Sequence, residues 1–406
     1  MSANQQYTIP DFDALFTGWE PTLIINPHYE RVRAETDAWL LPYCQWKRNK
    51  LANLSALDFT YVTAVTFPGA DYEQLKTVSD YFTWAFVYDD RFDVGEFAED
   101  ADAAERALAQ TYRVLTGDPS ADAQDDDEYS YGLDRALKDI WRRAYPGASR
   151  GCRERFIKSI EAWFGAVHRQ IKGPIKGEVL DVKEQVALRT LSVGDRPCYA
   201  LTEWVLGLDL PEDAMKDPAM VRIHDSASRL MFLVNDILSW AVEKDDGLTH
   251  NTVSLIMVAR NVSLQEAVDE VTEMIRKDLI EWQAAKKEMG RYVDDQVRQY
   301  ILACERWIVG SLHWSFRSKR YYGNDGALVR ACRVIHISQA PVRHQPAKAQ
   351  DVRVDIPSSQ TFLPCRSASE PEDGRRKYAL YLAAGVTVFQ LTRWILPSLN
   401  LYVFDN

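Results

Sequence analysis

The stretch Phe232–Glu243 reads FLVNDILSWAVE. Within this apolar run, Asn235, Ser239 and Glu243 follow one another at intervals of four residues. Steps of four keep side chains on one face of an α-helix. An amide oxygen, a hydroxyl and a carboxylate on one face are donors that a hard cation such as Mg²⁺ prefers. The stretch therefore predicts a helix that carries a magnesium half-site.

A second oxygen-rich motif lies far upstream. The apolar, aromatic run Tyr81–Tyr88 (YFTWAFVY) leads directly into Asp89, Asp90 and Asp93. Asp89 and Asp93 are four residues apart and share a helix face, whereas Asp90 points in another direction. We expect Asp89 and Asp93 to form a second metal face and Asp90 to pair with an arginine. Two such faces predict a cluster of cations that holds a polyphosphate.

Either motif alone has an ordinary explanation. Clustered aspartates occur on solvated helix ends, and an Asn/Ser/Glu trio can arise by chance. Both motifs lie beside strongly apolar helical runs, however, where an unpaired carboxylate is costly to bury. Their joint presence therefore favours a functional site. The acidic stretch Asp118–Glu128 lies in a polar context instead, and we expect it to be a solvated loop.

Composition bounds the class of protein. The chain has 406 residues, of which 46% are hydrophobic, so it can bury a large core. Its formal charge of −11, without a basic stripe, argues against nucleic-acid binding. Six cysteines without CxxC spacing argue against a zinc site or a disulfide framework, and Met1–Asp11 has no apolar signal segment. We expect a cytoplasmic protein.

The hydrophobic spacing predicts the fold. From about Tyr29 to Tyr322 apolar residues recur at intervals of three and four, and few β-type alternations intervene. Turns are expected at Pro68-Gly69, Gly117–Pro119, Pro146-Gly147 and Gly173-Pro174. We therefore predict an all-α helical bundle around a central apolar cavity.

The character of the chain changes after Gly323. Residues 324–377 carry five prolines and no sustained helical period, which is typical of a loosely ordered linker. Residues 378–406 begin with fifteen uncharged, largely apolar residues, too few for the roughly 20 that span a bilayer. Packing on residues 1–323, the predicted catalytic domain, and peripheral membrane contact both stay open for this C-terminal segment.

A pocket that binds a diphosphate through metals also needs cationic donors. Arginine suits this role because its planar fork grips phosphate oxygens in pairs. Arg189 and Arg320 are the candidates, and Tyr321 adds a phenol beside Arg320. A second pair, Arg291-Tyr292, lies in a polar stretch that is more typical of a surface, although spacing alone does not exclude it.

Together these motifs resemble those of class I terpene cyclases, in particular the fungal sesquiterpene synthases. The resemblance covers roughly residues 25–322. It includes INPHYE at Ile25–Glu30, AETDAWL at Ala34–Leu40, both oxygen-rich motifs and the late Arg320-Tyr321. It implies an all-α class I terpenoid synthase fold.

The resemblance also implies roles for individual residues. Asp89 and Asp93 would bind two of three Mg²⁺ ions, for which Mn²⁺ can substitute, and Asn235, Ser239 and Glu243 would bind the third. Arg189 matches the diphosphate-sensing arginine, and Arg320 and Tyr321 match the closing diphosphate contacts. The chain departs from its relatives at Val242, where they often carry lysine. Lys244 lies two residues later and is expected either to contact diphosphate from a shifted angle or to face solvent.

The implied reaction is the ionisation of a prenyl diphosphate, farnesyl diphosphate above all, followed by carbocation cyclisation. The cavity wall should then be aromatic. The expected wall residues are Phe82, Phe86, Trp204, Phe232 and Trp314.

Two other functions remain as alternatives. A chain-elongating prenyltransferase would carry a second aspartate-rich motif where this chain has the Asn/Ser/Glu trio, and a non-catalytic lipid-binding helical protein would not need intact ligands. No obligatory protein partner is evident, and a homodimer stays open.

Overall fold

Two long helices, α5 (Tyr72–Asp93) and α12 (Pro218–Glu243), carry the oxygen-rich motifs at their C-terminal ends. The start of α12 follows from its sequence: the Asp217 carboxylate accepts a hydrogen bond from the Ala219 amide at 2.8 Å, and Pro218 occupies the first turn, where it loses no bond. Apolar side chains bury both helices along most of their length. Each motif thus sits at the end of a helix anchored in the core.

The computed structural model describes residues 6–19, 23–44, 51–93, 95–117, 132–176, 178, 180–244 and 250–337. The other elements of the N-terminal half are β1 (Gln6–Thr8), α1 (Phe12–Leu15), α2 (Tyr29–Leu40), α3 (Leu51–Leu57), α4 (Thr60–Thr66), α6 (Ala101–Thr116), α7 (Gly132–Ala144), the short 3₁₀ helix η2 (Tyr145–Gly147) and α8 (Arg150–Ile175). The remaining elements are α9 (Val182–Ser192), α10 (Arg196–Val205), α11 (Glu212–Lys216), α13 (Thr252–Arg260), α14 (Leu264–Met289), α15 (Asp295–Arg317), α16 (Lys319–Tyr322), α17 (Gly326–Cys332) and β2 (Val334–His336).

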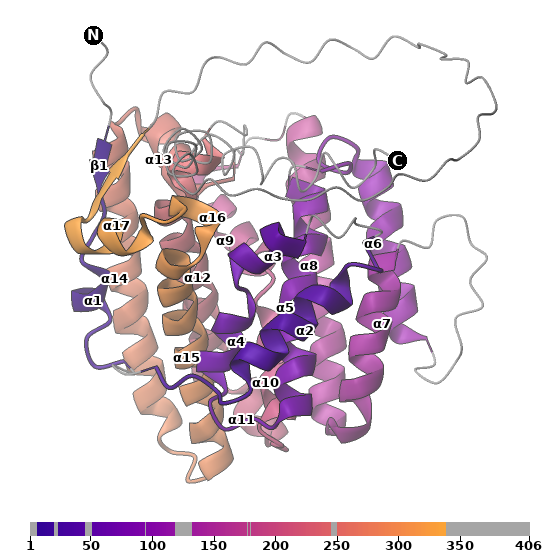
Figure 1. The fold of residues 1–406 in the computed structure, drawn as a ribbon. Helices are drawn as coiled ribbons and strands as arrows, with labels where there is room; N and C mark the ends of the chain where they lie inside the picture. The colour runs from indigo at the N-terminus through magenta and orange to yellow at the C-terminus, as the bar shows by residue number, and fades with distance from the viewer. Residues whose placement is uncertain are drawn as a thin grey trace, which may run out of the picture.

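The helices pack as a bundle around α5 and α12 (Figure 1). Helix α12 packs against α14, α15, α9 and α13, while α5 packs against α2, α4, α7 and α10. Fully buried aromatic residues such as Trp84, Tyr88 and Phe156 fill the space between α5, α7 and α8. The predicted all-α fold is confirmed.

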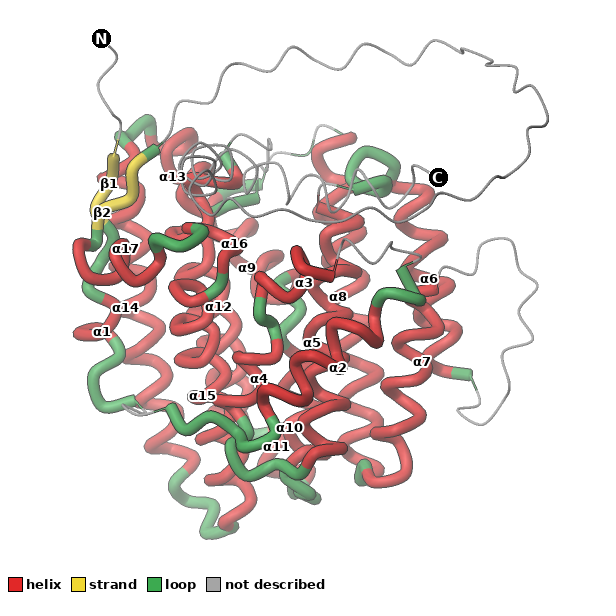
Figure 2. The backbone as a smooth tube through the Cα atoms, in the orientation of Figure 1, coloured by secondary structure: helices red, strands yellow, loops and turns green. Residues whose placement is uncertain are grey.

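The two short strands join the two ends of the described chain (Figure 2). They pair antiparallel, with Tyr7 opposite Ile335. The buried Tyr7 hydroxyl donates to the Ile237 carbonyl of α12 at 2.9 Å, which ties the sheet to the bundle. Residues 324–337 therefore form α17 and β2 on the bundle, where the sequence had predicted the start of a linker. The C-terminal segment 378–406 lies outside the described residues.

The connections agree with the sequence in part. Pro68-Gly69 forms the turn between α4 and α5, and Pro146-Gly147 lies in η2, as predicted. Gly173-Pro174, however, lies inside the last turn of α8. The Gly173 carbonyl accepts hydrogen bonds from the Lys176 and Glu178 amides, and these bonds close the C-terminal end of the helix. The Asp118–Glu128 stretch is outside the described residues, and among those described no helix has the length and apolarity to cross a membrane.

Gly326 tests whether α17 belongs to the folded core. A Cβ atom on Gly326 would lie 1.8 Å from the backbone oxygen of Phe316 in α15. We expect Gly326→Ala to lower the free energy of unfolding by about 1–3 kcal/mol, because the backbone contact must move. Gly69→Ala is the control, since nothing lies within 4 Å of its Cβ position. Equal urea midpoints for the two variants would place α17 outside the cooperative core.

Candidate active site

One pocket connects the motifs that the sequence singled out. It is bounded by α5, α8, α9, α10, α12, α15 and α16. Its polar lining residues are Asp89, Asp93, Arg189, Asp195, Asn235, Glu243, His250, Ser311, Arg320 and Tyr321. Its apolar and aromatic lining includes Phe82, Phe86, Trp163, Cys198, Tyr199, Met231, Trp307 and Trp314. The pocket therefore combines a charged region with a largely aromatic one.

The aspartate motif lies at the end of α5, where its members separate as their spacing requires. Asp89 and Asp93 line the pocket. Asp90 instead accepts a hydrogen bond from Arg320 at 3.2 Å, the ion pair with an arginine that the sequence predicted. The α5 motif thus presents two carboxylates to the pocket and a third to α16.

The α12 trio lies on one face of its helix, opposite α5. The Asn235 amide donates to the Tyr321 hydroxyl at 2.8 Å, and the Ser239 hydroxyl donates to the Asn235 carbonyl at 2.8 Å. Glu243 accepts from the Asn251 amide at 2.9 Å. Asn235 and Glu243 line the pocket, whereas Ser239 is fully buried and is not among the described lining residues.

The two candidate arginines enter from different elements. Arg189 on α9 donates to the buried Asp236 carboxylate at 2.8 Å. Arg320 on α16 binds Asp90. Among the described residues, Arg189 Nε and Arg320 Nη1 are buried and have no hydrogen-bond partner. Buried guanidinium donors without partners are costly, so both arginines have capacity left for an anion.

The alternative pair Arg291-Tyr292 lies elsewhere. Both side chains bind Asp217, the N-cap of α12. A helix of 26 residues is roughly 39 Å long at 1.5 Å per residue, so this pair sits at the opposite end of α12 from Glu243. The structure thus brings Arg320-Tyr321 to the pocket and leaves Arg291-Tyr292 away from it.

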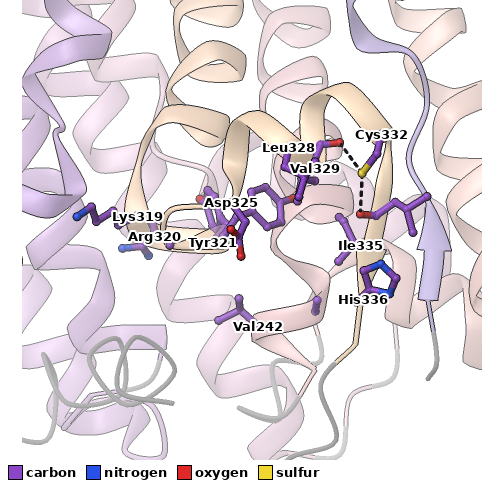
Figure 3. Close-up of a pocket in the computed structure, with 14 residues that line it drawn as sticks. Val242, Lys319, Arg320, Tyr321, Asp325, Leu328, Val329, Cys332, Ile335 and His336 are labelled. Carbon is purple, nitrogen blue, oxygen red and sulfur yellow. Dashed lines mark hydrogen bonds between the residues drawn. The ribbon is translucent and has the colours of Figure 1, made fainter. Parts of the chain in front are cut away.

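Val242 and Lys244 flank Glu243 but do not line the pocket. Val242 lines a neighbouring groove between the end of α12, α16, α17 and β2, which shares Arg320 and Tyr321 with the pocket (Figure 3). Lys244 is the half-buried C-cap residue of α12. A lysine at position 242 would thus enter this neighbouring groove.

The predicted wall residues divide into two groups. Phe82, Phe86 and Trp314 line the pocket. Phe232 is fully buried under the guanidinium of Arg189, whose Cζ lies 5.4 Å from the ring centroid. Trp204 lies near the end of α10 beside Gly147, and neither Phe232 nor Trp204 is among the described lining residues. The apolar pattern marks a helix's buried face, but it does not distinguish core from cavity.

Several residues of the site escaped sequence reasoning. Asp236 accepts from both Arg189 and the Thr252 amide, so it joins α9 to the start of α13. Asn251 caps α13 and holds Glu243. Asn251 lies eight residues beyond Glu243 in sequence, outside the helical spacing that revealed the trio.

The glycine Gly194 lines the pocket between α9 and α10 in a left-handed conformation (φ 74°). A Cβ atom there would lie 2.9 Å from the Trp163 ring. Only glycine satisfies both the backbone conformation and this close approach. The GD dipeptide Gly194-Asp195 after a helical run was the signal available in the sequence.

The acidic groups raise one another's affinity for protons. Burial raises the pKa of Asp89 well above its usual range, and repulsion from Asp93 and Asp90 adds to the effect. Burial and then Asp236 raise the pKa of Glu243 to about 7. Burial also lowers the pKa of His250 to about 3, so that this imidazole is neutral. The pocket thus gathers carboxylates whose charge Arg189 and Arg320 compensate only in part, an environment that favours bound cations.

The donor set fits Mg²⁺ held jointly with a ligand. In the part of the chain that the structure describes, no three His, Cys, Asp or Glu side chains converge to form a cage for one ion. Mg²⁺ usually takes one or two carboxylates and completes its six oxygen ligands with water and phosphate. Carboxylate faces on α5 and α12, with arginine donors nearby, match that habit.

Comparisons with known proteins agree with this geometry. The model of terpene synthase family 2, C-terminal metal binding, matches residues 80–281. Silphinene synthase peniA of Penicillium patulum is 31% identical over 81% of this chain and 89% of its own length. Sesquiterpene synthase Agr1 of Cyclocybe aegerita is 30% identical over 77% of this chain and 88% of its own. The crystal structure of α-eudesmol synthase superposes with a TM-score of 0.63 at 24% identity, over 73% of this chain and 97% of that one, which supports the fold.

These findings define the protein as a terpene cyclase of the class I all-α fold. The chain belongs to the fungal sesquiterpene synthase family. Membership decides between the enzyme classes that the sequence left open, since the relatives named above are synthases of terpenes. It also indicates dependence on a divalent metal.

The raised pKa of Glu243 gives a stability prediction. A carboxyl pKa near 7 in the folded protein, against 4.5 as the usual value, means that folding binds a proton between these pH values. Metal-free protein should therefore lose stability as pH rises from 4.5 through 7. Glu243→Gln removes this titration, so its stability relative to wild type should increase by about 1–3 kcal/mol between pH 5 and pH 8. Urea unfolding in EDTA measures the difference, and an unchanged difference at both pH values would contradict it.

Proposed function

We propose that the protein is a sesquiterpene synthase that ionises farnesyl diphosphate and cyclises the resulting carbocation. The observation that carries the proposal is the single pocket in which two carboxylate faces and two arginines meet an aromatic wall. The names of the relatives, which include sesquiterpene synthases, support a fifteen-carbon substrate. Diphosphate and a cyclic hydrocarbon or alcohol would be the products.

Asp89 and Asp93 on one side and Asn235, Ser239 and Glu243 on the other would hold the metal ions, three Mg²⁺ or Mn²⁺ in their place. Ser239 can accept a metal through its oxygen lone pair while its hydroxyl still donates to the Asn235 carbonyl. Bound Mg²⁺ would act as a Lewis acid that draws negative charge onto the leaving diphosphate. The pKa shifts in the pocket support this assignment, because cations relieve the carboxylate repulsion.

Arg189, Arg320 and Tyr321 would bind the diphosphate oxygens. Arg189 Nε and Arg320 Nη1 are the unpartnered donors, and burial raises the pKa of Tyr321 to about 12, which keeps its hydroxyl protonated. These donors are strongest where negative charge develops as the carbon–oxygen bond breaks. They therefore favour the transition state over bound substrate.

Phe82, Phe86 and Trp314 would surround the prenyl chain. Phe86 and Trp314 have ring centroids 5.4 Å apart, and Phe82 lies 5.1 Å from Phe86. Such a wall excludes water, which would quench the carbocation, and its ring faces stabilise positive charge. The order of cyclisation steps depends on the wall's contour.

The reaction is tested by incubating the purified protein with farnesyl diphosphate and Mg²⁺, with and without isopentenyl diphosphate. We expect cyclic sesquiterpenes in both samples and none in EDTA. Asn235→Ala and Glu243→Ala should each lower kcat/KM by about 10³, in the range for groups that stabilise developing charge. The control Arg222→Gln lies on the same helix, α12, where it removes partly exposed ion pairs with Glu281 and Glu288 of α14, and it should keep activity. Longer prenyl diphosphates in place of hydrocarbons would refute cyclisation.

The wall assignment predicts a change of product. Phe86→Leu replaces an aromatic ring that lines the pocket with a smaller aliphatic side chain. It should change the ratio of products or raise the share of alcohols formed when water captures the carbocation. Trp204→Leu removes an aromatic ring that lies beside Gly147 and should leave the ratio unchanged. Gas chromatography with mass spectrometry measures both. Equal product profiles for Phe86→Leu and wild type would remove Phe86 from the wall.

A further inference from the structure

Asp58 occupies an unusual position in the turn between α3 and α4. Its backbone is left-handed (φ 51°), a conformation that residues with a Cβ rarely adopt, although aspartate tolerates it better than most. The residue is only 6% exposed. A buried carboxylate on an unfavourable backbone persists only where its contacts hold it.

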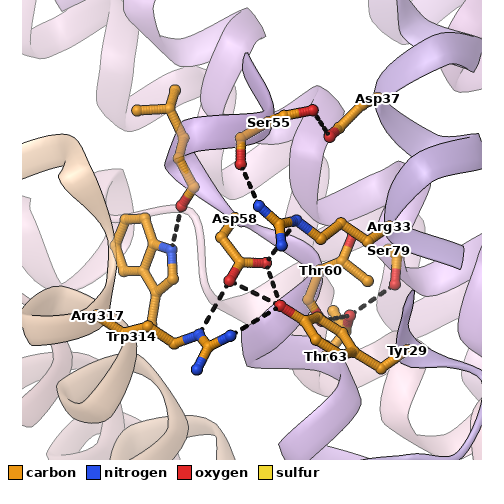
Figure 4. Close-up of polar contacts among 11 residues, drawn as sticks. Tyr29, Arg33, Asp37, Ser55, Asp58, Thr60, Thr63, Ser79, Trp314 and Arg317 are labelled. Carbon is orange, nitrogen blue, oxygen red and sulfur yellow. Dashed lines mark hydrogen bonds and ion pairs between the residues drawn. The ribbon is translucent and has the colours of Figure 1, made fainter. Parts of the chain in front are cut away.

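The contacts of Asp58 join three segments that are distant in sequence (Figure 4). The Tyr29 hydroxyl donates to both carboxylate oxygens, at 2.8 and 2.7 Å. Arg33, which lies on the same helix as Tyr29, α2, forms an ion pair with the Asp58 carboxylate at 3.3 Å. Arg317, the last residue of α15, donates to Oδ2 at 3.0 Å. Asp58 therefore holds the end of α15 against α2.

A second contact fixes the same end of α15. The Trp314 indole donates to the Leu57 carbonyl at 2.7 Å, one residue before Asp58. The Arg317 guanidinium also lies 4.6 Å from the centroid of the Tyr61 ring. Trp314 and Arg317 are one helical turn apart, so the α3–α4 turn holds the last turn of α15 at two points.

The diphosphate-binding corner begins immediately after Arg317. Ser318 ends α15, where its amide donates to the Trp314 carbonyl at 2.7 Å. Its hydroxyl also caps α16 by accepting from the Arg320 amide at 3.0 Å. Helix α16 has only four residues and packs on α3. So short a helix has little stability of its own, and its direction depends on the contacts around it. This corner fixes its N-terminal end, while the Tyr322 hydroxyl donates to the Leu238 carbonyl of α12 at 2.7 Å.

We propose that Asp58 is a positioning residue: by holding Arg317 it fixes the corner between α15 and α16, and thereby aims Arg320 and Tyr321 into the pocket. This inference rests on the proposed diphosphate role of Arg320 and Tyr321. Asp58 does not line the pocket, and it acts through Arg317 alone among the residues of that corner.

Loss of the Asp58 charge should change the position of the α15–α16 corner more than it changes the free energy of unfolding. The Arg317 and Arg33 side chains are 46% and 29% exposed, so water can solvate both guanidinium groups once the carboxylate is gone. Partly exposed ion pairs contribute little to stability for that reason. The position of Arg317, by contrast, depends on this carboxylate: its guanidinium also donates to the Tyr29 hydroxyl at 3.3 Å, but Asp58 holds that hydroxyl as well.

The test compares Asp58→Asn with Asp278→Asn. Asparagine keeps the size of the side chain and tolerates the left-handed backbone. The control Asp278 is also a buried carboxylate, bound by Arg229 at 2.7 Å between α12 and α14 and away from the pocket. We expect Asp58→Asn to raise KM for farnesyl diphosphate about tenfold, with a smaller change in kcat, and to weaken binding of inorganic diphosphate in Mg²⁺ by a similar factor. Asp278→Asn should leave both values within about twofold of wild type.

A double-mutant cycle makes the test specific. If Asp58 acts through Arg320, adding Asp58→Asn to Arg320→Gln should weaken diphosphate binding by less than twofold beyond Arg320→Gln alone. Arg317→Gln changes a half-exposed side chain and should reproduce the effect of Asp58→Asn on diphosphate binding. It replaces Asp58→Asn in the test if the Asp58→Asn protein does not fold. Additive losses of diphosphate binding in the double variant would overturn the inference. So would an Asp58→Asn variant whose KM and diphosphate binding match those of Asp278→Asn. An inactive wild type would refute the proposed reaction instead, and the diphosphate titration would still test Asp58.

Discussion

The removal of several carboxylates from water in one pocket is the constraint on which the rest of the site depends. Asp89, Asp93 and Glu243 face one pocket from the ends of α5 and α12, and burial raises the pKa of each. A protein that needed only stability would have apolar residues here. The arrangement is favourable when cations and an anion enter together, because each neutralises the charge that makes the other costly to bury.

The surrounding structure holds the charged groups of the pocket in place. Asp236 holds Arg189, Asn251 holds Glu243, and Asp90 holds Arg320. Each arginine nevertheless keeps a buried donor without a partner. The site is thus organised around an incomplete set of charges rather than around one reactive side chain. This agrees with a reaction that needs no protein nucleophile, in which the protein supplies binding, orientation and exclusion of water.

Much of this site could be predicted from the sequence because its proposed metal ligands follow helical spacing. Asp89/Asp93 and Asn235/Ser239/Glu243 are encoded by steps of four, and the bundle follows from apolar periodicity. Residues that act by pairing across the fold could not be found in this way. Asp236 lies inside the α12 motif but off the face that its steps of four define, and Asn251 and Asp58 are single polar residues with no spacing that marks them. Trp204 shows the same limit for apolar residues, since the sequence does not tell whether a tryptophan packs on the core or lines a cavity. The end of the folded body was also placed too early, because α17 and β2 are short and gain their stability from packing on α15 and β1.

Metal-dependent binding of diphosphate is the central claim, and calorimetry tests it without reference to any product. Titrating inorganic diphosphate into the purified protein in Mg²⁺ should give saturable binding that disappears in EDTA, and binding of Mg²⁺ should tighten when diphosphate is present. Both results follow from cations and anion that neutralise the same pocket. Diphosphate binding of equal strength in Mg²⁺ and in EDTA would contradict the account, since Arg189 and Arg320 would then bind the anion without help from the carboxylate faces.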